Sequence, residues 1–149
     1  MHCKEFKTRY QGLDATDSAT MMQCLEHVQD CKPCLSYMSQ VDLELKGIDL
    51  SAYPCIHMAN YASFRCEHHP NLKDCSDATI LYDARFDEYS LNSARAWVVP
   101  IQYCPFCGSE LPESKRDRWF KELAALGYDN PRQQAIPEKY KSDLWYRTP

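Results

Sequence analysis

Apolar side chains recur at helical spacing in the first third of the chain. A polar run at 16–18 offers N-cap residues, and the apolar positions that follow it are Met21, Met22, Leu25 and Val28. Residues three and four apart share one face of a helix, so this pattern predicts a helix that ends near Cys31. Proline is tolerated only in the first turn of a helix, so Pro33 predicts a break and a second helix over about 34–46. Gly47 is a typical helix end.

A different pattern begins at Ala78. Three segments rich in β-branched and aromatic residues are separated by polar residues, which predicts a three-stranded antiparallel meander. The segments are 78–82, 86–91 and 96–103. Pro100 cannot donate a ladder hydrogen bond, so we expect the last segment to be an edge strand or to contain a bulge.

A further helix is predicted after the meander. Pro112 suits its first turn, Ser114 and Asp117 have the spacing of a capping box, and Gly127 ends it. Its apolar stripe consists of Trp119, Phe120, Leu123 and Leu126. We expect the residues at 144–146, which include two aromatics, to anchor the end of the chain on the core.

The composition is that of an ordinary globular protein. Of 149 residues, 44% are hydrophobic and 26% are charged, which argues against disorder. The net charge of −4 gives no overall electrostatic attraction to nucleic acid, which argues against nucleic acid as a partner. The basic run at 115–118 is interrupted by an acidic residue and is predicted to be a solvated helix face. No apolar run approaches the roughly 20 residues that cross a bilayer, so we expect no membrane span.

Cysteine is the unusual component. The chain has nine cysteines and five histidines, and its polar start has no apolar core of a signal peptide. A secreted disulfide scaffold is therefore disfavoured, and a cytoplasmic location is predicted. In a reducing compartment, clustered cysteines usually indicate metal or redox chemistry.

The first cluster has the form His-x3-Cys-x2-Cys, at His27, Cys31 and Cys34. Residues four apart lie on one face of a helix, so His27 and Cys31 point the same way, and Cys34 comes from the next helix. Three such ligands suit tetrahedral zinc, which needs one more.

The fourth ligand is predicted to be Cys3, with His2 as the second choice. Cys24 is seven residues from Cys31, about 10.5 Å along a helix. Two cysteines that share a zinc hold their Cα atoms at most roughly 7 Å apart, so Cys24 is too distant.

This segment resembles the zinc-binding anti-sigma domain, over residues 2–46. Cys3, His27, Cys31 and Cys34 match its motif, and the proline before the last cysteine is typical of it. The resemblance implies a helical zinc module that clamps a sigma factor. In some members of that family, oxidation of the thiols expels zinc and releases the partner. This chain departs from the family in two ways: no transmembrane anchor follows the module, and a different module follows instead.

The second cluster contains the run Cys-Pro-Phe-Cys-Gly, at 104–108. This is the form of a zinc knuckle, in which a tight turn aims two thiolates at one metal and glycine permits a left-handed residue. A knuckle supplies two ligands, so Cys104 and Cys107 need a second pair.

Cysteine and histidine are concentrated in the segment 66–75, which can supply the further ligands. The predicted set is four of five residues, namely Cys66, His69, Cys75, Cys104 and Cys107. The sequence leaves open whether His69 or Cys75 completes the set, and it does not exclude Cys55 or His57. With two zinc ions per chain, Cys24 and Cys55 are left over.

Residues 55–147 also resemble an uncharacterised family of bacterial and phage proteins. The matching runs are Phe-Asp-Glu-Tyr at 86–89, the knuckle at 104–108, Leu-Pro-Glu-Ser-Lys-Arg-Asp-x-Trp-Phe at 111–120, Ile-Pro-Glu at 136–138 and Ser-Asp-x-Trp at 142–145. The resemblance implies a zinc-ribbon-like fold and leaves function open.

The predicted fold is α+β, in two zinc-stabilised modules. Residues 1–47 form a helical anti-sigma-like module, 48–54 a linker, and 55–149 a zinc-ribbon-like antiparallel meander with a packed C-terminal helix.

Sulfur-rich sets of four ligands are predicted to be closed and structural. The chain lacks both His-Glu-x-x-His and the deaminase signature, which disfavours a zinc hydrolase. A dithiol redox enzyme using Cys104 and Cys107 is a second alternative, but such a motif normally follows the first strand of a βαβ unit. We therefore predict a non-catalytic, zinc-binding regulatory protein that binds a protein partner and has redox-sensitive thiols. The first candidate for the partner is a sigma factor. The alternative is that the chain is a phage or bacterial inhibitor or immunity protein, whose partner is a host enzyme or a toxin.

Overall fold

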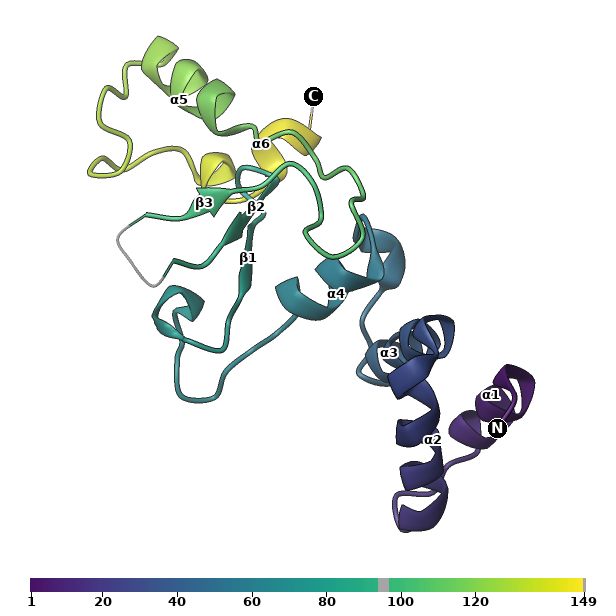
Figure 1. Ribbon diagram of the computed structural model, residues 1–149. Helices are drawn as coiled ribbons and strands as arrows, with labels where there is room; N and C mark the ends of the chain where they lie inside the picture. The colour runs from purple at the N-terminus through teal and green to yellow at the C-terminus, as the bar shows by residue number, and fades with distance from the viewer. Residues whose placement is uncertain (94–96, 149) are drawn as a thin grey trace. The chain divides into compact units, whose positions relative to one another are not determined.

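The computed structural model describes residues 1–93 and 97–148 and has the predicted α+β class (Figure 1). Its helices are α1 (Cys3–Gln11), α2 (Ser18–Asp30), α3 (Lys32–Leu45), α4 (Ile56–Ala62), α5 (Arg116–Ala125) and α6 (Leu144–Arg147). Its strands are β1 (Ile80–Asp83), β2 (Glu88–Leu91) and β3 (Val99–Pro100), and single 3-10 turns lie at Leu50–Ala52, Leu72–Asp74 and Glu138–Lys141. The chain divides into two compact units, Met1–Asn60 and Tyr61–Pro149. In the described part of the chain, no helix has the length and apolar character needed to span a membrane.

The first unit is built from three helices that contact one another. The Asp17 carboxylate accepts a hydrogen bond from the Thr20 backbone N–H and so caps α2, as the sequence predicted. Phe6 is fully buried, and its ring stacks on Tyr10 at 5.6 Å between centroids. The Tyr10 hydroxyl donates to the Asp42 carboxylate at 2.5 Å, which ties α1 to α3. α1 was not predicted from the sequence.

A small buried cluster lies where the three helices meet. Its buried side chains are Phe6, Cys24, Val28 and Cys34, with Tyr10, Cys31, Tyr37 and Met38 packed against them. Two of the four buried members are cysteines, so thiols occupy positions that larger apolar residues normally fill.

The second unit contains an antiparallel sheet in the order β1-β2-β3. Ile80 pairs with Leu91 and Asp83 with Glu88, so a tight turn joins β1 to β2. The third strand is shorter than predicted, because pairing covers only Val99–Pro100, and predicted position 96 lies outside the described residues. It lies at the edge of the sheet, where the missing N–H of Pro100 is tolerated.

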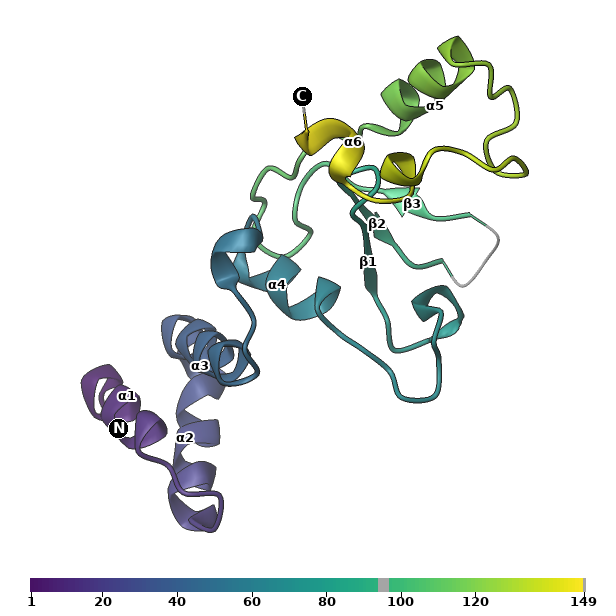
Figure 2. The same cartoon turned by 180° about the vertical axis from the view of Figure 1, so that it is seen from behind.

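Aromatic side chains form the core of the second unit. The buried members are Phe86, Trp119, Leu123, Tyr140 and Trp145. The Trp145 indole N–H donates to the Arg85 carbonyl at 2.7 Å, so α6 is anchored beside the β1–β2 turn, as Figures 1 and 2 show. The expected role of the C-terminal aromatics as anchors is confirmed.

The long helix of this unit differs from its prediction at both ends. α5 begins at Arg116 rather than at Pro112, and the Ser114 hydroxyl accepts the Arg116 backbone N–H at 3.2 Å. Leu126 follows the end of α5 and is 58% exposed, because the chain turns away at Gly127 before a further helical turn forms. The buried stripe therefore ends at Leu123.

A buried ion pair joins the sheet to α5. Glu88 is 3% exposed, and its carboxylate accepts two hydrogen bonds from the Arg116 guanidinium, at 2.6 and 3.1 Å. The Ser114 hydroxyl donates a third, at 2.6 Å. Burial acts to raise the pKa of Glu88, but the hydrogen bonds from Arg116 and Ser114 outweigh it and hold the pKa below its ordinary value.

We expect Arg116→Ala to destabilise the second unit by about 3 kcal/mol at neutral pH, because it leaves a buried carboxylate without its cation. A carboxyl with a lowered folded pKa contributes stability above its unfolded pKa and loses it as the pH falls through the folded pKa. The difference between variant and wild type should therefore shrink below about pH 4.5. Urea unfolding at pH 7 and pH 4 measures this.

Arg118→Ala is the matched control. Arg118 pairs with Glu122 on the exposed face of the same helix, so its loss should cost less than about 1 kcal/mol. If the two variants lose the same unfolding free energy at both pH values, the buried pair has no special role in stability.

Candidate metal centres

Four predicted ligands converge in the first unit. The ligand atoms of Cys3, His27, Cys31 and Cys34 all lie within 4.8 Å of one another. The Cys3 and Cys31 sulfurs are 3.6 Å apart. Three sulfurs and one imidazole nitrogen in such a cluster are a typical ligand set for tetrahedral Zn²⁺.

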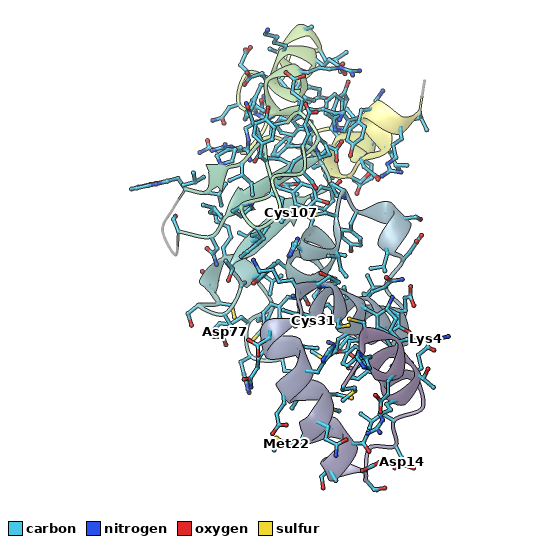
Figure 3. All side chains as sticks on the ribbon, turned by 45° about the vertical axis from the view of Figure 1, so that its right-hand side comes forward. Lys4, Asp14, Met22, Cys31, Asp77 and Cys107 are labelled. Atoms are coloured by element: carbon cyan, nitrogen blue, oxygen red, sulfur yellow. The ribbon has the colours of Figure 1, made fainter. Side chains whose placement is uncertain are left out.

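Each of the four is placed by a helix end or a helix face. Cys3 is the first residue of α1, and His27 lies in the last turn of α2. Cys31 separates α2 from α3, at the position labelled in Figure 3, and its carbonyl accepts the Cys34 backbone N–H at 3.1 Å. Pro33 in the first turn of α3 fixes the direction of that helix, so Cys34 turns back toward Cys31.

The His27 imidazole provides a test of whether a metal fits. Its Nε2 atom is buried and has no hydrogen-bond partner among the described residues. Buried polar nitrogens are nearly always satisfied, so an unsatisfied one requires an explanation. A metal ion held by the neighbouring thiols would explain the unsatisfied atom, because Nε2 would then be a metal ligand.

The thiols of this set differ in acidity. Burial raises the pKa of Cys34 to about 12, with a further contribution from the neighbouring Cys31 and Cys3 thiols. The backbone N–H of Cys34 lowers the pKa of Cys31. Zinc binds thiolates, so binding here must displace protons, and the affinity must fall as the pH falls.

Two residues considered for this site lie outside it. His2 precedes α1 and is not part of the convergent group, and the same holds for Cys24. Cys24 is fully buried on α2, and burial raises the pKa of its thiol. It is a small core side chain, as free cysteine often is.

The predicted knuckle forms a tight turn in the second unit. The Phe106 backbone N–H donates to the Cys104 sulfur at 3.4 Å, and the Gly108 N–H donates to the Cys104 carbonyl at 2.8 Å. Gly108 has φ +76°, the left-handed conformation expected from the motif. Backbone N–H groups aimed at a sulfur are typical of a thiolate that binds a metal. Figure 3 labels Cys107 in this turn.

A second group in this unit consists of Cys66, His69 and Cys75, whose ligand atoms lie within 4.8 Å of one another. The structure does not include Cys104 and Cys107 in this group, so the five residues predicted to supply one site belong to two places. Their spacing revealed each segment as a source of ligands, but it did not show which segments pair. Which of the five bind metal remains a prediction.

We expect His27→Ala and Cys34→Ser each to lower bound zinc by one ion per chain and to unfold the first unit. Elemental analysis and far-ultraviolet circular dichroism measure the two effects. Cys24→Ala is the matched control, since it removes a buried sulfur outside the ligand set. This variant should keep its zinc, and its free energy of unfolding should fall by about 1 kcal/mol. Full zinc content in both ligand variants would contradict the assignment.

Comparison with known proteins identifies the second part of the chain. No curated protein and no solved structure matches it. One family profile does, over residues 52–148, which is more than half of the chain and includes the knuckle and the segment 66–75. The chain belongs to the family DUF6980, a domain of unknown function.

Proposed function

We propose that the chain is a non-catalytic zinc-binding protein that regulates a protein partner by binding it. The observation that carries the proposal is the convergence of Cys3, His27, Cys31 and Cys34. A zinc ion held by three sulfurs and an imidazole has no coordination position left for a substrate. Such an ion holds helices together and leaves their outer faces for recognition.

The knuckle cysteines, Cys104 and Cys107, are proposed to ligate a second structural zinc. The family match, over residues 52–148, includes both of them.

The knuckle turn packs on an aromatic ring of its own unit. Tyr61 stacks on Phe106, which lies between the two knuckle cysteines, at 4.8 Å between centroids and 6° between planes.

Exposed apolar side chains on the helices support a protein partner. Met22 and Leu25 on α2 are three residues apart and are 59% and 40% exposed, and Leu35 on α3 is 43% exposed. Large apolar residues that cluster on exposed helix faces often mark a protein-binding surface. The anti-sigma resemblance makes a sigma factor the first candidate.

We expect the zinc-loaded chain to retain a sigma factor of its source organism in a pull-down, and the chelated chain to retain none. Met22→Asp and Leu25→Asp should weaken binding at least about tenfold, since each places a charge on the proposed surface. Leu45→Asp, at the exposed end of α3, is the control and should bind normally.

Binding that survives complete zinc removal would overturn the proposed role of the metal. Retention of one unrelated enzyme, with no sigma factor, would favour the inhibitor or immunity alternative. Retention of neither would contradict regulation by either partner.

The first set is also proposed to respond to oxidants, because Cys3 is exposed and its sulfur is 3.6 Å from that of Cys31. We expect hydrogen peroxide to join Cys3 to Cys31 and to release one zinc ion per chain. A colorimetric zinc indicator and mass spectrometry of tryptic peptides measure these events. Zinc that stays bound while peroxide is consumed would contradict the redox response.

A further inference from the structure

The segment between α4 and β1 brings Cys66, His69 and Cys75 together in a group of three. The Cys66 sulfur is 3.2 Å from the His69 Nδ1 atom. Cys75 follows the 3-10 turn Leu72–Asp74 and is buried. The donor set is two sulfurs and one imidazole, which suits zinc better than Mg²⁺ or Ca²⁺, both of which prefer oxygen.

The loop that carries this group is held by hydrogen bonds of its own. The Asn92 side-chain amide donates to the Leu72 carbonyl at 3.2 Å and to the Cys75 carbonyl at 3.1 Å. The Asn71 side chain accepts the Lys73 backbone N–H at 3.2 Å. Asn92 directly follows β2, so the sheet fixes the position of Cys75.

The run Cys-Glu-His-His at 66–69 resembles the knuckle at 104–107, with a histidine in place of the second cysteine. In each run two residues separate the two ligand types, so a short turn can direct both at one ion.

The group has three ligands rather than four. Among the described residues, no fourth Cys, His, Asp or Glu joins it, although His68 is the neighbour of a ligand. Residues 94–96 and 149 are alanine, arginine and proline, none of which is a member of these four types. Zinc sites with three protein ligands keep their fourth position for water or for an exogenous ligand.

We propose that Cys66, His69 and Cys75 bind a zinc ion of their own, whose fourth position is open to water and exchanges it for a thiolate. The ion is separate from the one that the knuckle holds. The exchangeable position makes this a binding site for a small thiol or for a cysteine of another protein. In this exchange the thiol loses its proton to solvent, its sulfur bonds to zinc, and the bound water leaves.

Metal counting on the full chain tests whether the site is separate. We expect Cys75→Ser and Cys104→Ser each to lose one zinc ion per chain and the double variant to lose two. Cys24→Ala again serves as the buried-cysteine control and should lose none. If the five residues share one ion instead, the double variant loses no more than either single variant, which would overturn the proposal.

Cobalt substitution tests the open position. With Co²⁺ in place of zinc, added 2-mercaptoethanol should shift the visible d–d bands of the wild type. The shift should disappear in Cys75→Ser and in His69→Ala. His69→Ala is included because Cys75 is buried and its replacement could disturb folding. Visible bands that 2-mercaptoethanol leaves unchanged would show a closed site. Neither experiment depends on the first site, whose cobalt should stay bound in both variants.

Discussion

In the first unit, four side chains that could hold a metal ion converge beside a small apolar cluster. That cluster has four buried members, two of which are cysteines. Burying one large apolar side chain contributes roughly 1.5–3 kcal/mol, whereas a structural zinc in a small domain contributes about 10–16 kcal/mol. A zinc ion bound by these four residues would therefore make folding of this unit and metal binding one equilibrium, and removal of the ion would also remove the surface that the helices present.

The second unit is stabilised differently. It encloses Trp119, Phe86 and Trp145 in one aromatic cluster, and Glu88 with Arg116 ties the sheet to α5. These interactions lie in the sheet and the C-terminal helices, while the cysteines lie in the loops. Metal ions bound there would fix the conformation of loops on a fold that already has its own core. Loss of metal would thus destabilise the second unit less than the first.

Local patterns predicted α2, α3, α5 and the sheet, but not α1, α4 or α6. The stripe of α2, the proline at the start of α3 and the turn glycine after the knuckle each act within a few residues, so the sequence was sufficient. α1 was missed because Phe6 is its only fully buried side chain, and one apolar residue gives no periodicity. The third strand was overestimated because only Val99 and Pro100 pair with β2, and the length of a paired stretch depends on the partner strand as well as on the composition of the segment itself.

The pairing of ligands depends on contacts between residues far apart in the chain. The convergence of His27, Cys31 and Cys34 could be predicted because they lie within eight residues, in the last turn of α2, at the junction and in the first turn of α3. The group at 66–75 is shaped by Asn92, which holds the Cys75 carbonyl from 17 residues away. No local pattern reveals such a bond, so the sequence could supply the ligand segments but not their assignment. A loop fixed in this way can offer a metal three protein ligands rather than four. A site with four protein ligands only holds helices together, whereas a site with three can exchange its fourth ligand.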